Sequence, residues 1–205
     1  MKILFMGTPD FAAIHLRALC DYAAECGDEI VGAVTQEDKP RGRGYKLTPP
    51  PVKVAAMERG IPVYQPATLK GEEFAALLSS LDPEIIVVVA FGKILPVSVL
   101  EYPKYGCVNV HGSLLPEYRG AAPIQRAVID GKEITGITTM YMDEGLDTGD
   151  ILLTKSDAEN IFIQLSTSFL PPIVAGFVMA GILAATISSS DSYLLIAASA
   201  FSKNI

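Results

Sequence analysis

Five consecutive β-branched residues at positions 85–89, IIVVV, constrain the fold of this chain more than any other feature of its sequence. A strand without a polar position is buried on both faces, as in a parallel sheet that helices cover on either side. Similar apolar runs at 2–7 and 29–36 alternate with stretches of helical character. This alternation predicts an α/β, Rossmann-like fold with a mostly parallel sheet and helices on both faces.

The segments between the expected strands carry helix and loop signals. Thr8 is expected to cap the first helix, with Pro9 at its first position and Asp10 in its first turn. The glycines and prolines of KPRGRGYKLTPPPVK, residues 39–53, predict a loop. Further helices are expected at 52–60, 71–81 and within 122–131, and the last readable α/β segments at 134–145 and 149–156.

The character of the chain changes near residue 156, which divides it into an α/β part, 1–156, and an apolar tail, 157–205. IVAGFVMAGILAATI, residues 173–187, carries no charge, and with the residues before it approaches the length of a membrane span. Its small residues are typical of packed membrane helices. A buried helix of the same domain is the alternative, and the Pro171-Pro172 pair argues against one straight span.

Composition excludes several classes of protein. The formal net charge of −7 argues against a general nucleic-acid binder, although it leaves room for a local basic patch. The 3 cysteines form no CxxC pair and indicate reduced thiols in a cytoplasmic protein. With 2 histidines and no cysteine cluster, we expect no metal site. The Lys- and Arg-rich loop at 39–53 is either a solvated loop or a segment that orders on RNA.

CVNVHG, residues 107–112, is the stretch that suggests chemistry. Asn109 and His111 share one face of the expected strand, at the end where parallel sheets form their ligand crevice. A histidine can exchange a proton near neutral pH, and an amide can donate to an oxygen that gains negative charge. The pair therefore suits attack on a carbonyl carbon, although a histidine at a strand end is often only structural.

A carboxylate that orients the histidine would complete such a site. The sequence DEGLDTGD offers four candidates, and spacing alone does not choose among them: Asp143, Glu144, Asp147 and Asp150.

Five motifs in order, GTPDFA, KPRGRGYKLTPPPVK, VVVAFGKILP, NVHGSLLPEYRGAAPIQ and MDEGLDTGDIL, resemble the methionyl-tRNA formyltransferase family over residues 1 to about 155. The resemblance implies a transferase of translation initiation, which moves a formyl group from 10-formyltetrahydrofolate to the α-amine of methionyl initiator tRNA without a metal. It also implies that the catalytic domain is truncated at its C-terminal end.

The same resemblance implies a role for each matching residue. Asn109, His111 and Asp147 fall on the catalytic triad of the family. The donor-binding residues would be Phe91, Gly92, Lys93, Ser113, Leu114, Leu115 and Pro116. Arg41, Arg43 and Lys46 would contact the initiator tRNA.

Residues 157–205 resemble a fragment of a sodium/solute symporter, which is too short to build a transport pathway. The chain would then be a fused or truncated protein, or a membrane-tethered one with membrane contact through residues 161–205. Two alternatives to methionyl-tRNA formylation stay open: formyl transfer to another amine, such as a sugar nucleotide, and an inactive fragment.

Overall fold

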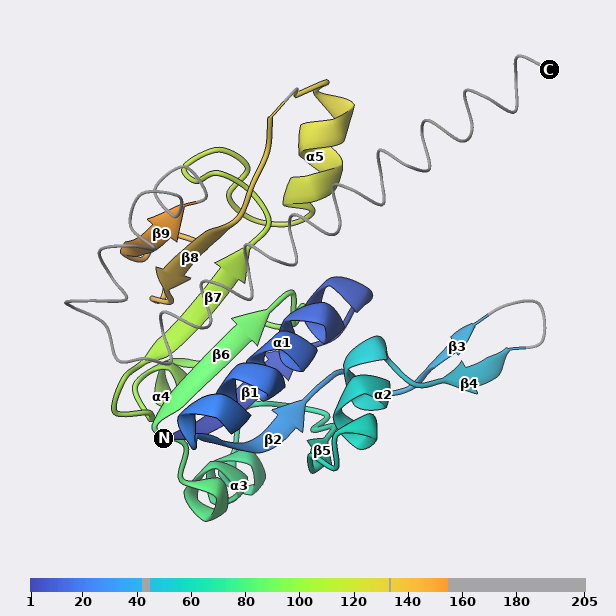
Figure 1. The fold of residues 1–205 in the computed structure, drawn as a ribbon, viewed down its shortest axis with the longest axis vertical. Coiled ribbons are helices and arrows are strands. Elements are labelled where there is room, and N and C mark those ends of the chain that lie inside the picture. Colours follow the sequence, from blue (N-terminus) through green and yellow to red (C-terminus); the bar gives the residue numbers. More distant parts are fainter. Residues whose placement is uncertain (42–44, 133, 155–205) are drawn as a thin grey trace.

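The computed structural model describes residues 1–41, 45–132 and 134–154, which form a sheet covered by helices (Figure 1). The 7-stranded sheet has the order β5-β2-β1-β6-β7-β8-β9. Its first five members in this order pair in parallel, and β8 and β9 are antiparallel. The expected α/β fold with a mostly parallel sheet is therefore confirmed. Its strands are β1 (Lys2–Gly7), β2 (Glu29–Val34), β5 (Val63–Tyr64), β6 (Ile85–Val89), β7 (Cys107–His111), β8 (Thr138–Tyr141) and β9 (Ile151–Thr154).

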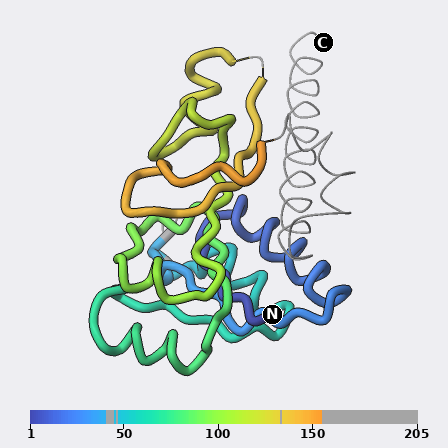
Figure 2. Tube along the Cα trace, turned by 90° about the vertical axis from the view of Figure 1, so that its left-hand side faces the viewer, coloured from blue at the N-terminus to red at the C-terminus, as the bar shows by residue number. Residues whose placement is uncertain are grey.

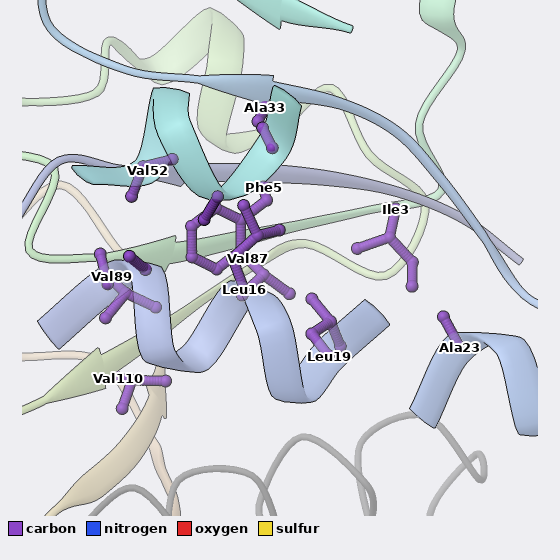
Figure 3. Close-up of a cluster of buried hydrophobic side chains, with 14 of the residues drawn as sticks. Ile3, Phe5, Leu16, Leu19, Ala23, Ala33, Val52, Val87, Val89 and Val110 are labelled. Carbon is purple, nitrogen blue, oxygen red and sulfur yellow. The ribbon is translucent and has the colours of Figure 1, made fainter. Parts of the chain in front are cut away.

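Helices cover both faces of the sheet, as expected. They are α1 (Asp10–Cys26), α2 (Pro51–Glu58), α3 (Glu72–Leu81), α4 (Val97–Leu100) and α5 (Pro123–Ile129). Strand β6 explains the apolar run, because Val87 packs in a core with Leu16 of α1, whereas Val88 packs in a second core with Leu78 of α3 (Figure 3 shows the first). Each fully buried side chain of this size contributes roughly 1.5–3 kcal/mol.

The expectation for Thr8 is wrong. Pro9 holds the N-cap position of α1, and no side chain caps the helix there. The Thr8 hydroxyl instead donates to the carbonyl oxygen of Phe91, 3.0 Å away, in the segment after β6. A tertiary acceptor thus takes the hydroxyl that the local sequence assigns to the helix.

The loop expected at 39–53 contains regular structure on both sides of its tip. Strands β3 (Lys39–Arg41) and β4 (Lys46–Thr48) pair antiparallel, with Arg41 opposite Lys46, and α2 follows at Pro51. We call β3 and β4 the basic hairpin; Figure 1 shows it projecting beyond α2. Arg43 lies outside the described residues.

The two ends of the sheet lie far apart. In Figure 2, the yellow trace after β7 lies at one end of the described part and the teal trace of α3 at the other. The expected tail, 157–205, with its apolar run and membrane contact, lies outside the described residues. Among the helices of 1–41, 45–132 and 134–154, none has the length and apolar character of a membrane span.

Candidate active site

Asn109 and His111 come from β7, which has a neighbour on each side of it in the sheet. Their side chains share one face, as strand alternation requires, and are 8% and 6% exposed. Strand β7 ends at His111, so both residues lie at the carboxyl edge of the parallel strands. Two nearly buried polar side chains therefore lie at the end of a strand that is paired on both sides.

Asp147 reaches these residues from the loop between β8 and β9. Its Oδ1 accepts a hydrogen bond from Asn109 Nδ2 at 3.2 Å, and its Oδ2 accepts the Gly120 amide N–H at 2.8 Å. The same Oδ2 lies 3.5 Å from His111 Nδ1, with the Asp147 side chain 13% exposed. The structure thus brings the amide, imidazole and carboxylate together, and it selects Asp147 from the carboxylates of its loop.

Asp143 has a different role in that loop. Its Oδ1 accepts hydrogen bonds from the Gly145 amide at 3.0 Å and the Thr148 hydroxyl at 2.8 Å, which close the turn that contains Asp147. The turn also needs Gly149, where a Cβ atom would lie 2.0 Å from the Tyr141 carbonyl oxygen. Asp147 itself has a φ of 53°, in the left-handed region. These features hold the loop so that Asp147 turns back toward β7.

The second ring nitrogen of His111 faces a backbone carbonyl. His111 Nε2 lies 2.9 Å from the Tyr118 oxygen, and Tyr118 has a φ of 59°. A carbonyl oxygen only accepts, so Nε2 carries the hydrogen in this contact. Because Nδ1 faces a carboxylate, a neutral ring satisfies one of the two acceptors and a positively charged ring satisfies both.

The segment Ser113–Pro116 follows β7 directly and is tied to β8. The fully buried Thr138 hydroxyl donates to the Ser113 carbonyl at 2.7 Å and accepts the Leu115 amide at 3.0 Å. The Ser113 hydroxyl donates to the Glu117 carbonyl at 2.6 Å. Leu115 is buried, Leu114 is half-buried and Pro116 is exposed. A ligand would therefore meet Leu114 and Pro116 rather than the serine hydroxyl.

The segment Phe91–Lys93 is held at both ends. The Phe91 ring is buried, and its carbonyl oxygen accepts the Thr8 hydroxyl and, at 2.8 Å, the Gln36 amide Nε2. Gly92 has a φ of 79° and is exposed. Lys93 Nζ donates to the carbonyl oxygens of Pro66 at 2.9 Å and Ala67 at 3.0 Å.

Sequence reasoning gave Thr8 the role of a helix cap and missed Gln36, although both residues hold the segment Phe91–Lys93. It also missed Thr138, which holds the segment Ser113–Pro116. Thr8 and Gln36 each stand within two residues of the end of a buried parallel strand. A polar residue just after such a strand is a signal that would have found them. Within the described residues, His, Cys, Asp and Glu form no group of three or more that could hold a metal ion.

The fold and this geometry define a class: α/β proteins with an amide, an imidazole and a carboxylate gathered at the carboxyl edge of a parallel sheet. Within it, the chain belongs to the formyl transferase family, whose sequence model matches residues 1–167. A second model, that of the sodium:solute symporter family, matches residues 134–205.

Methionyl-tRNA formyltransferases are similar to much of the chain. The enzyme of Pelotomaculum thermopropionicum is 58% identical over 158 residues, which cover 77% of this chain and 49% of that protein. The enzyme of Caldicellulosiruptor saccharolyticus is 62% identical over 156 residues, covering 76% and 49% respectively. The chain thus spans less than half the length of these two relatives.

Solved structures confirm the fold. A phosphoribosylglycinamide formyltransferase from Bacillus halodurans superposes with a TM-score of 0.61 at 19% identity, covering 93% of this chain and 97% of that one. A sugar N-formyltransferase from a Shewanella species gives a TM-score of 0.54 at 20% identity, covering 76% and 56%.

Proposed function

We propose that this chain transfers a formyl group from 10-formyltetrahydrofolate to the α-amine of methionyl initiator tRNA, in the cytoplasm. The main observation in support of the proposal is that the Asp147 carboxylate contacts both the Asn109 amide and the His111 ring. The identity to methionyl-tRNA formyltransferases over 158 residues supports the choice of reaction. We further propose that residues 1–156 are the catalytic unit and 157–205 a separate tail.

In the proposed reaction, the α-amine of methionine attacks the formyl carbon of the donor. A C–N bond forms, the carbonyl oxygen becomes an oxyanion, and the bond from that carbon to N10 of the folate then breaks. The Asn109 amide N–H and the His111 Nε2–H would donate to the oxyanion, and such donors stabilise charge that develops in the transition state. The formyl oxygen would then replace the Tyr118 carbonyl as the acceptor of Nε2.

The reaction also moves one proton from the attacking nitrogen to N10 of the departing folate. His111 can give its Nε2 hydrogen to N10 and then take up the proton of the attacking nitrogen, or a water molecule held beside the ring can carry the proton. Asp147 would stabilise a positive charge on the ring through its contact with Nδ1, and its bond from Gly120 holds the carboxylate in place. No step of this transfer needs a redox partner.

The donor would lie between the segments Phe91–Lys93 and Ser113–Pro116. Gly92 and Pro116 are exposed and Leu114 is half-buried, so the segments offer backbone groups and apolar atoms to a flat pterin. The Lys93 amine is occupied by two carbonyl oxygens, so this residue would shape the segment rather than pair with a carboxylate of the donor.

The acceptor tRNA would bind at the basic hairpin. Arg41 and Lys46 are paired in the register of β3 and β4, and Arg43 lies between them in sequence. A concentration of Lys and Arg in a chain of net charge −7 suits contacts to phosphates, which are the source of most affinity for RNA.

A direct formylation assay with the purified full chain tests the proposal. Wild type is expected to formylate Met-tRNA, and Asn109→Ala and His111→Ala are expected to lower kcat by about 10²-fold or more. Arg41→Ala and Lys46→Ala should raise the KM for tRNA and leave the catalytic residues Asn109, His111 and Asp147 untouched. A wild-type chain that formylates a sugar-nucleotide amine and not Met-tRNA would replace the acceptor, and one that transfers to neither would end the proposal.

A further inference from the structure

Polar residues stand just after several parallel strands, at the same edge of the sheet as Asn109 and His111. Thr8 follows β1, Gln36 follows β2 and Gln65 follows β5, while Phe91–Lys93 follows β6. Because parallel strands end at a common edge, these segments meet there although they are distant in sequence. Neither Gln36 nor Gln65 has a part in the proposed chemistry, so their contacts call for an explanation.

Gln36 joins three of these segments through one side chain and one carbonyl. Its Nε2 donates to the Phe91 carbonyl at 2.8 Å, and its Oε1 accepts Lys39 Nζ at 2.7 Å. Its backbone oxygen accepts Gln65 Nε2 at 2.7 Å. Lys39 is the first residue of β3, so a single amide group connects the basic hairpin to the proposed donor segment.

The start of the hairpin is fixed by a closed set of hydrogen bonds. Lys53 Nζ donates to both carboxylate oxygens of Asp38 at 2.9 Å and to Gln65 Oε1 at 2.9 Å. Gln65 Nε2 also donates to Asp38 Oδ1 at 2.8 Å. The hydrogen bond from Gln65 and, to a smaller extent, that from Lys53 lower the pKa of Asp38, so its carboxylate stays charged at neutral pH. The base of the hairpin is therefore held against Gln36.

The donor segment is held just as closely on its side. Lys93 binds the carbonyl oxygens of Pro66 and Ala67, which directly follow Gln65. Gly92 lies close to the Gln36 amide, because a Cβ atom at this residue would lie 2.5 Å from Gln36 Nε2. A displacement of the Gln36 amide must therefore shift the peptide group of Phe91 or break its hydrogen bond.

We propose that Gln36 is a positioning residue that couples the basic hairpin to the Phe91–Lys93 segment, so that binding of tRNA at one and of the folate donor at the other influence each other. The inference rests on the proposed function, and it adds a link between the two substrates. Coupling of this kind is reciprocal: whatever the hairpin does to donor affinity, the donor does to tRNA affinity.

A double-mutant cycle between Lys39 and Gln36 tests the coupling, with the KM for the donor as the readout. Gln36→Leu removes both side-chain hydrogen bonds and is expected to raise this KM about fivefold, the equivalent of one neutral hydrogen bond. Lys39→Met removes the hydrogen bond from the hairpin to Gln36 Oε1 and keeps the bond from Gln36 to Phe91, so it should raise this KM about twofold. In the Gln36→Leu background, Lys39→Met should have no further effect, because the group that connects the two sites is gone.

Thr8→Val is the matched control. It removes the other donor to the Phe91 carbonyl without touching the hairpin. We expect Thr8→Val to raise the KM for the donor by a similar factor. In the Thr8→Val background, Lys39→Met should still raise this KM about twofold, so that the two effects multiply. All variants should keep kcat near the wild-type value, since Asn109, His111 and Asp147 are not in the network.

Equilibrium dialysis with tetrahydrofolate repeats the cycle without turnover, so that a failure of the proposed function and a failure of the coupling are distinguished. A wild-type chain that formylates no Met-tRNA would refute the proposed function, whereas the dialysis cycle decides the coupling by itself. An unchanged donor affinity in Lys39→Met, or effects that simply multiply in the Lys39–Gln36 pair, would refute the inference.

Discussion

Asp147→Asn removes the charge of the site and nearly preserves its shape. The carboxylate accepts hydrogen bonds from Asn109 and Gly120 and lies beside His111 Nδ1. A carboxamide has one acceptor oxygen and an NH₂ group, so it must direct an N–H toward Asn109 or toward Gly120. Its best arrangement keeps the oxygen on the Gly120 side, which forces Asn109 to turn its own amide over and changes what Asn109 presents to a substrate.

The size of the effect follows from these contacts. Each of the two hydrogen bonds, at 3.2 and 2.8 Å, changes from charge-assisted to neutral, a loss of about 1 kcal/mol apiece. The free energy of unfolding should therefore fall by about 2 kcal/mol. The rate should fall much further, by about 10²- to 10⁴-fold in kcat, because His111 loses its anionic partner and Asn109 its orientation.

Formylation of Met-tRNA and urea unfolding, measured on the same preparations, check both numbers. Asp143→Asn is the matched control, since it makes the same change in the same loop at a carboxylate that contacts Gly145 and Thr148 and not the pair on β7. It should retain most of the activity. The reasoning is refuted if Asp147→Asn keeps a rate within a few-fold of wild type, or if both variants lose activity equally.

Three further predictions concern buried or half-buried side chains, two of them in comparison with an exposed residue of the same type. Burial lowers the pKa of His15 from 6.5, so the unfolded chain binds the proton of this residue more tightly than the folded chain does. The free energy of unfolding should therefore fall as the pH drops below about 6.5. Urea unfolding at about pH 7.5 and 5.5 should show this fall in wild type and not in His15→Leu. The exposed thiol of Cys26 in α1 should react promptly with a thiol reagent at neutral pH. Burial raises the pKa of Cys20 in the same helix to about 11, so its thiol should react only after denaturation. Mass spectrometry of the labelled chain would show the difference. Leu16→Ala, at a fully buried position, should lower the free energy of unfolding by about 2–5 kcal/mol, against about 0.5 kcal/mol or less for Leu47→Ala, which is 64% exposed.

The sheet was predictable because its signal is local. Residues 85–89 are apolar throughout, and the structure puts Val87 and Val88 in different cores. The common face of Asn109 and His111 follows from strand alternation alone. The antiparallel direction of β8 and β9 did not follow, because it depends on which neighbours the strands find and not on their own composition.

Long-range partners account for what the sequence did not show. The Thr8 hydroxyl has a good local use as a helix cap, and only the position of Phe91 in space reveals its real acceptor. Spacing could not choose Asp147 over Asp143, because the choice depends on a left-handed turn. This turn points the Asp147 carboxylate toward β7, whereas the Asp143 carboxylate accepts hydrogen bonds from its own loop. Residues 39–53 read as a loop because Gly and Pro are local signals, whereas the pairing of β3 with β4 is not.

The candidate site is divided between a rigid and a less rigid part of the molecule. Asn109 and His111 lie on a strand with hydrogen-bonded neighbours on both sides, whereas Asp147 and Tyr118 lie on loops. Local opening of loops takes far less free energy than separation of central strands. Low denaturant concentrations would therefore withdraw the carboxylate while the sheet stays intact, so inactivation would precede the loss of secondary structure, and amide hydrogens of β7 would be among the last to exchange.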